Sequence, residues 1–97
     1  MIARIALNPL IEHALAGDAG AWRQLAERLY PWALRLARRR LPRGLDPEDA
    51  VQEAFLTAYQ KLPGLRAREA LPAWLAAIIG SHCLRLAMSQ PPESSLE

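Results

Sequence analysis

One stretch near the middle of the chain, residues 46–62, limits the possible folds more than any other. Asp46 belongs to the residue types that cap the free amides at a helix start, and the fixed φ of Pro47 suits the first helical position. Glu48 and Asp49 then face the positive end of the helix dipole. Apolar residues follow at helical spacing: Ala50, Val51, Ala54, Phe55, Ala58 and Leu62. This pattern predicts an amphipathic helix that ends before the next Pro-Gly pair.

Similar spacing predicts helices on both sides of this segment and no strand. A short helix over residues 10–15 should follow Pro9 and stop at Gly17. Asp18 is the expected cap of a long helix that reaches residue 40. Pro31 interrupts that helix, so we expect either a kink near residues 29–31 or two short helices.

A last helix should start near Leu71 or Pro72 and run towards Leu86. The predicted fold is therefore all-α, a compact bundle of three main helices plus a short N-terminal helix. One domain should cover residues 1–88, followed by a disordered tail over residues 89–97. Seven side chains are expected to meet in the core: Trp22, Leu25, Leu36, Val51, Phe55, Leu75 and Ile78. Trp32 is also expected there.

Composition excludes several classes of protein. A chain of 97 residues supports one small core rather than a core with a deep catalytic cleft, so we do not expect an enzyme. The single cysteine, Cys83, excludes an internal disulfide and is expected to be a small apolar filler. His13 and His82 lack the paired cysteines of a zinc site, and no cofactor is expected. No apolar run approaches the length of a membrane span, which favours a cytoplasmic protein.

Charge is unevenly distributed along the chain. Residues 46–60 contain four acids and no base, although the whole chain carries a net charge of +2. Asp49, Gln52 and Glu53 stand at i, i+3 and i+4, so they share one helix face. This polar strip could grip an arginine-rich partner helix, or it could be an ordinary solvated face. An arginine cluster also has two possible interpretations: it could bind DNA phosphates, or it could be a solvated helix end. It consists of Arg35, Arg38, Arg39, Arg40 and Arg43.

Four segments in order resemble region 2 of bacterial RNA polymerase sigma factors, best the extracytoplasmic-function group. They are "AGDAGAWRQL", "LRLARRRL", "PEDAVQEAFLTAY" and "LRAREALPAWL", and the resemblance covers residues 10–88. It implies docking on the beta-prime clamp coiled coil of core RNA polymerase through Asp49, Gln52 and Glu53, with Glu48 at the rim. It also implies that the loop over residues 62–70 and the last helix help recognise and open the minus-ten promoter element on the non-template strand. The expected DNA-binding residues are Lys61, Arg66, Arg68, Trp74 and Arg85. Trp74 could stack on a base or belong to the core.

The last helix departs from the family pattern. Ala77 and Gly80 stand where arginines are usual, and only Arg85 is charged between Pro72 and Pro91. These 97 residues are not expected to include a counterpart of region 4, the second DNA-reading domain of the family. Because the last helix has lost most of its charge, two alternatives remain beside sigma region 2 activity. One is a sigma-like regulator that binds polymerase or an anti-sigma factor without promoter activity, and the other is a generic helical interaction module. An anti-sigma protein is a further expected partner.

Overall fold

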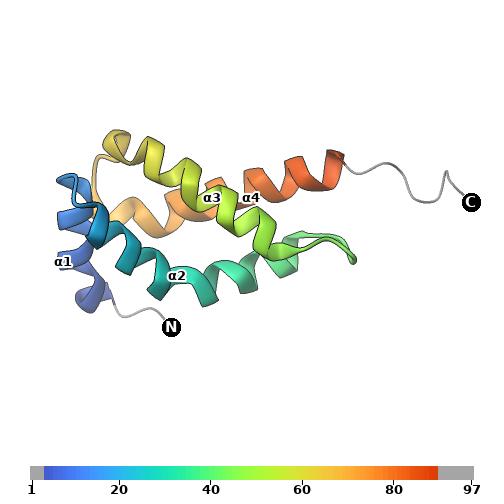
Figure 1. The fold of residues 1–97 in the computed structure, drawn as a ribbon, viewed down its shortest axis with the longest axis horizontal. Coiled ribbons are helices and arrows are strands. Elements are labelled where there is room, and N and C mark those ends of the chain that lie inside the picture. The colour runs from blue at the N-terminus through green and yellow to red at the C-terminus, as the bar shows by residue number, and fades with distance from the viewer. Residues whose placement is uncertain (1–3, 90–97) are drawn as a thin grey trace, which may run out of the picture.

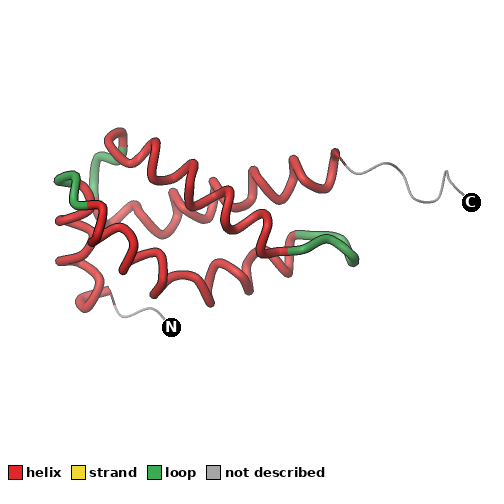
Figure 2. The backbone as a smooth tube through the Cα atoms, viewed as in Figure 1, coloured by secondary structure: helices red, strands yellow, loops and turns green. Residues whose placement is uncertain are grey.

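The computed structural model describes residues 4–89, and every regular element in this range is helical (Figures 1 and 2). The helices are α1 (Arg4–Leu15), α2 (Ala19–Arg40), α3 (Pro47–Lys61) and α4 (Leu71–Ser89). Two single turns of 3-10 helix, Leu62–Gly64 and Arg68–Ala70, lie between α3 and α4. The predicted all-α class is confirmed. α4 includes Ser89, and the remainder of the predicted tail lies outside the described residues.

The helix ends lie where the capping residues predict them. The Asp46 carboxylate accepts a hydrogen bond from the Glu48 amide at 2.9 Å, at the start of α3. Asp18 accepts one from the Ala21 amide at 3.1 Å, at the start of α2. Gly17 has a φ of 102°, a conformation that costs glycine no steric strain, and it turns the chain between α1 and α2. These local contacts fix where the helices begin without help from the core.

α1 begins earlier than the sequence predicts, and Pro9 lies inside it. A proline removes a single backbone hydrogen bond from a helix, so packing elsewhere on the helix can outweigh its cost. Leu7, Ile11 and Ala14 are buried against the rest of the bundle, on both sides of the proline. These tertiary contacts, rather than local preference, hold the longer helix.

α2 is one continuous helix through Pro31, so the alternative of two short helices is wrong. The ribbon changes direction midway along α2 (Figure 1). Pro31 is exposed and cannot donate to the Glu27 carbonyl, which accounts for a bend at this point. Leu29 and Ala33 are buried on the two sides of the proline, so core packing keeps the interrupted turn helical.

The core draws on all four helices. Of the predicted core residues, five are buried: Trp22, Leu25, Val51, Phe55 and Leu75. The prediction is wrong for three others, because Leu36, Ile78 and Trp32 are only half-buried at the edge of the core. In the second half of α2 the innermost positions belong to Ala33 and Ala37, whose small side chains let neighbouring helices approach closely. The larger residues beside them are displaced to the flanks of the buried face.

α4 is apolar along most of its length. The segment Arg68–Ser89 is long and apolar enough to cross a membrane by length and composition alone, so the expectation that no apolar run approaches that length is wrong. In the structure α4 packs on α3 and α2, and its inward side closes the bundle. The residues buried on that side are Leu71, Leu75, Ile79, His82 and Cys83.

Gly80 lies on α4 beside the end of α2. A Cβ atom built on Gly80 would lie 2.7 Å from Nη1 of Arg40, the far end of a flexible side chain. Arg40 is exposed and can move aside, whereas glycine within a helix costs about 1 kcal/mol relative to alanine. We therefore expect Gly80→Ala to raise the free energy of unfolding by about 0.5–1 kcal/mol in urea denaturation. A loss of stability would show that Arg40 is fixed over α4.

Candidate functional site

The polar strip on α3 consists of Glu48, Asp49, Gln52 and Glu53, and all four side chains are exposed. The opposite side of the same helix is buried through Val51, Ala54 and Ala58. The core thus fixes the rotation of α3 about its axis, and the strip is presented on a rigid element. The predicted sharing of one face is confirmed, whereas the role of these residues stays a prediction.

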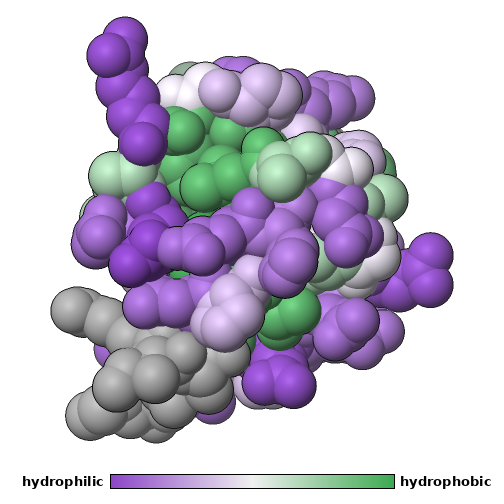
Figure 3. All heavy atoms as spheres, turned by 90° about the vertical axis from the view of Figure 1, so that its left-hand side faces the viewer, coloured by the Kyte–Doolittle hydropathy of each residue, from purple (hydrophilic) through white to green (hydrophobic). Residues whose placement is uncertain are grey.

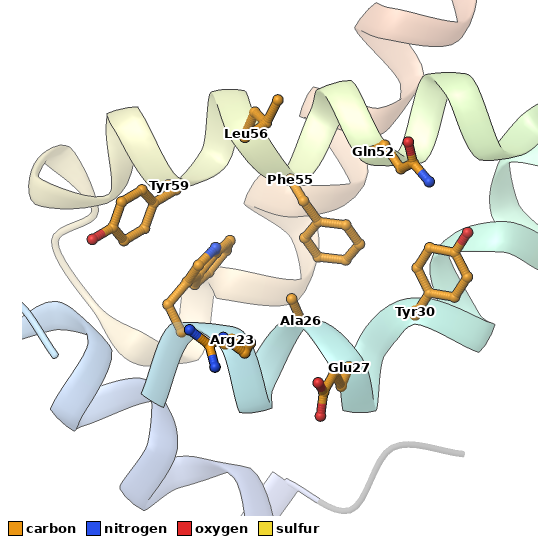
Figure 4. Close-up of a pocket in the computed structure, with 9 residues that line it drawn as sticks. Arg23, Ala26, Glu27, Tyr30, Gln52, Phe55, Leu56 and Tyr59 are labelled. Atoms are coloured by element: carbon orange, nitrogen blue, oxygen red, sulfur yellow. The ribbon is translucent and has the colours of Figure 1, made fainter. Parts of the chain in front are cut away.

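An open groove of about 630 Å³ runs between α2 and α3, beside the polar strip (Figure 4). Its floor is aromatic. The Trp22 ring meets Phe55 edge-on at a centroid distance of 6.1 Å and lies 6.0 Å from Tyr59. Leu56 and Tyr59 remain 66% and 42% exposed along one wall. The full lining is Trp22, Arg23, Ala26, Glu27, Tyr30, Gln52, Phe55, Leu56 and Tyr59.

Sequence reasoning missed this groove, although α3 carried a signal for it. Leu56 follows Gln52 by four residues and Tyr59 follows Leu56 by three, so both extend the polar strip along one helix face. A leucine on an otherwise polar face indicates a contact surface. The other wall could not be read in this way, because it comes from α2, about thirty residues earlier in the chain.

At one end of the groove, Tyr30 of α2 meets the polar strip of α3 (Figure 4). Loss of solvent raises the pKa of the Tyr30 hydroxyl, and the nearby Glu48 carboxylate acts in the same direction. A hydrogen bond with Gln52 acts against these two effects on the pKa. Gln52 therefore belongs to both surfaces: it is part of the polar strip and lines the groove.

Glu53 lies on the other side of the strip, next to α4. Its Oε1 atom lies 3.5 Å from Nδ1 of His82, while Nε2 of the same ring is 2.9 Å from the Thr57 hydroxyl oxygen. The His82 side chain is buried, with 7% of it exposed. Sequence reasoning missed its contact with Glu53.

The predicted DNA-binding residues are divided between two parts of the molecule. Lys61 and Arg66 are exposed at the end of α3 and in the loop that follows. Arg68 forms an ion pair with Glu12 of α1, and its Nε atom lies 4.0 Å from Glu69, so two carboxylates balance its charge. Figure 3 views this end of the molecule, where hydrophilic residues surround smaller hydrophobic areas.

Trp74 is half-buried against the core near the start of α4, which favours the core interpretation while leaving one side of the residue accessible. Arg85 is exposed on α4, eleven residues further on. At 1.5 Å per residue the two are separated by about 16 Å along the helix. The structure therefore does not bring Arg85 together with the loop.

The arginine cluster is exposed at the C-terminal end of α2 and in the following turn. Arg40 also lies near Cys83 of α4. Burial raises the pKa of the Cys83 thiol, and the Arg40 charge acts in the opposite direction. Cys83 is buried, as expected for an apolar filler. Within residues 4–89, no group of three or more His, Cys, Asp and Glu side chains could hold a metal ion.

Comparison with known proteins gives the same family as the four segments. A family model described as sigma-70 region 2 matches residues 25–90. The ECF RNA polymerase sigma-E factors of Escherichia coli strain K12 and of Shigella flexneri are each 33% identical to the chain over 91 residues. The matched region covers 91% of the chain and 47% of each relative, so the chain spans about half their length. No solved structure gives a significant match. The chain belongs to the sigma-70 region 2 family and is similar to the extracytoplasmic-function sigma factors.

Proposed function

We propose that the chain acts as region 2 of an extracytoplasmic-function sigma factor in transcription initiation, in the cytoplasm. In this role it docks on core RNA polymerase through the beta-prime clamp coiled coil. The observation that carries the proposal is the pairing of the polar strip with the apolar groove on the α2–α3 side of the bundle. Family membership supports the same role.

The chemistry of this surface fits an amphipathic helical partner. Asp49 and Glu53 offer carboxylates to arginine or lysine side chains, and Gln52 offers both a donor and an acceptor. The adjoining groove can take an apolar side chain from the same partner against Leu56 and Tyr59, which are its exposed apolar residues. A buried apolar anchor beside charged pairs is the usual arrangement of the residues that dominate binding energy. An anti-sigma protein that occupied this surface would compete with polymerase.

Promoter recognition is the second part of the proposal. Lys61 and Arg66 supply exposed charge near the loop, and Trp74 offers a partly exposed ring on which a base can stack. Arg68 would first have to leave Glu12, and Arg85 would contact the strand further along α4. The exposed side of α4 between them is uncharged at Ala73, Ala77 and Ser81. DNA contact should therefore be weak in the isolated chain and depend on polymerase.

The docking proposal is tested by measuring the affinity of the purified chain for core RNA polymerase. The double variant Gln52→Ala/Glu53→Arg should lose at least tenfold in affinity, because reversing an interfacial charge costs about 2 kcal/mol or more. A matched control, Gln24→Ala/Glu69→Arg, makes the same changes at exposed positions outside the strip and the groove and should bind as the wild type does. If the folded wild-type chain does not bind, the generic helical interaction module becomes the better explanation.

The sigma-like regulator without promoter activity is the second candidate, favoured by the uncharged side of α4 and the ion-paired Arg68. The two candidates differ in one measurement on the polymerase complex. Sigma activity requires the complex to bind single-stranded minus-ten DNA with an affinity that falls as salt rises. A complex that forms normally but binds this DNA no better than polymerase alone would favour the regulator.

A further inference from the structure

His82 has an arrangement that core packing alone does not explain. Its side chain is 7% exposed, yet both ring nitrogens are directed at polar groups of α3. Glu53 and Thr57 stand four residues apart on α3, so they are neighbours on the side of that helix next to α4. The imidazole lies against both, with Nε2 2.9 Å from the Thr57 hydroxyl and Nδ1 3.5 Å from Glu53 Oε1. Nδ1 is buried and has no hydrogen-bond partner of good geometry in the structure.

A buried ring nitrogen without a partner is costly, and the Glu53 carboxylate is the charged group next to it. When the Thr57 hydroxyl donates to Nε2, the ring proton lies on Nδ1 and points towards Glu53. A small rotation of the Glu53 side chain would complete a hydrogen bond to that proton. The Glu53 side chain is 69% exposed, so it remains accessible to a partner while it lies next to His82.

We propose that His82 is a positioning residue for the polymerase-docking surface: from α4, it holds the Glu53 carboxylate in the orientation that the partner binds. This inference rests on the proposed docking function and assigns a part in it to a residue outside the polar strip. Thr57 holds the imidazole, the imidazole orients Glu53, and Glu53 contacts the partner. Ordering a flexible side chain before binding lowers the entropy that association must lose.

The test is a double-mutant cycle on the affinity of the full chain for core RNA polymerase. The variants are His82→Leu, Glu53→Ala and the combination of both. Immobilising one such side chain is worth about 0.5–1.5 kcal/mol, so His82→Leu should weaken binding about threefold to tenfold. The same change should have no effect in the Glu53→Ala chain, where no acceptor is left for His82 to orient. A purely structural role for His82 would instead give equal losses in both chains.

Two milder variants keep the test decisive if His82→Leu does not fold. The side-chain amide of asparagine reaches about as far as Nδ1, and that of glutamine about as far as Nε2. His82→Asn should therefore retain the affinity for polymerase, whereas His82→Gln should lose about threefold to tenfold. The opposite order, or equal affinities, would overturn the proposal.

Asp49→Arg separates failure of this inference from failure of the docking proposal. If Asp49→Arg abolishes polymerase binding while the cycle gives no coupling between His82 and Glu53, docking stands and the positioning role is wrong. If neither Asp49→Arg nor Glu53→Ala changes the affinity, the polar strip is not the docking surface and both proposals fail. Nitrogen NMR of the free chain gives a second readout, because the proposal requires the His82 tautomer protonated on Nδ1.

Discussion

Leu75→Ala is expected to lower the free energy of unfolding by about 3 kcal/mol, within the range of about 2–5 kcal/mol found for buried leucines. Leu75 lies on the inward side of α4 and is completely buried. Alanine would leave a cavity on the inner side of α4, where that helix packs on α3 and α2, and rigid helices can only partly close such a space. Chemical denaturation followed by circular dichroism measures the change.

Leu84→Ala on the same helix is the matched control. Leu84 is 62% exposed, so its truncation should change the free energy of unfolding by less than about 0.5 kcal/mol. The two substitutions remove the same atoms from the same type of element and differ only in burial. Equal losses of stability in the two variants would mean that α4 does not pack on the bundle with its Leu75 side.

Leu56→Asp is expected to weaken binding to core polymerase about a hundredfold while leaving the chain folded. Leu56 is largely exposed in the free chain, so a carboxylate is tolerated there. In the proposed complex the groove is covered, and the new carboxylate would lose its water without gaining a partner. Burying an unpaired charge at an interface costs about 3 kcal/mol or more. Titration of polymerase with labelled chain measures the affinity, and circular dichroism checks the fold.

Leu84→Asp serves as the control for this experiment. It places the same charge on an equally exposed leucine of α4, away from the groove, and should leave polymerase affinity unchanged. If both variants bind as the wild type does, the groove lies outside the interface. If both lose binding, the effect comes from the added charge rather than from the groove.

The starts of α2 and α3 were predictable because they depend on neighbours in the chain. The Asp18 and Asp46 caps bind amides two or three residues away, and the buried stripe of α3 follows from helical spacing. The polar strip was predictable for the same reason, since Asp49, Gln52 and Glu53 share a face in any α-helix that contains them. The resemblance to the family was also visible in the sequence, because four segments match sigma region 2 in the same order.

Predictions were weaker at the edges of the buried faces. Leu36 and Ile78 fit the apolar stripes of their helices, yet each is only partly buried at the edge of the core. Helical spacing defines the centre of an apolar stripe. How much of the stripe's width becomes buried depends on how closely the next helix approaches. On α2 the small Ala33 and Ala37 set that approach.

The sequence by itself determined the helical class, the starts of α2 and α3 and the composition of the polar strip, because these depend on contacts within a few residues. Only the tertiary structure decided what surrounds the strip. The groove joins α2 to α3, the Arg68–Glu12 pair joins the loop to α1, and the contact of His82 with Glu53 joins α4 to α3. Each contact depends on how segments far apart in the chain pack against one another. Local helix propensities contain no information on that packing.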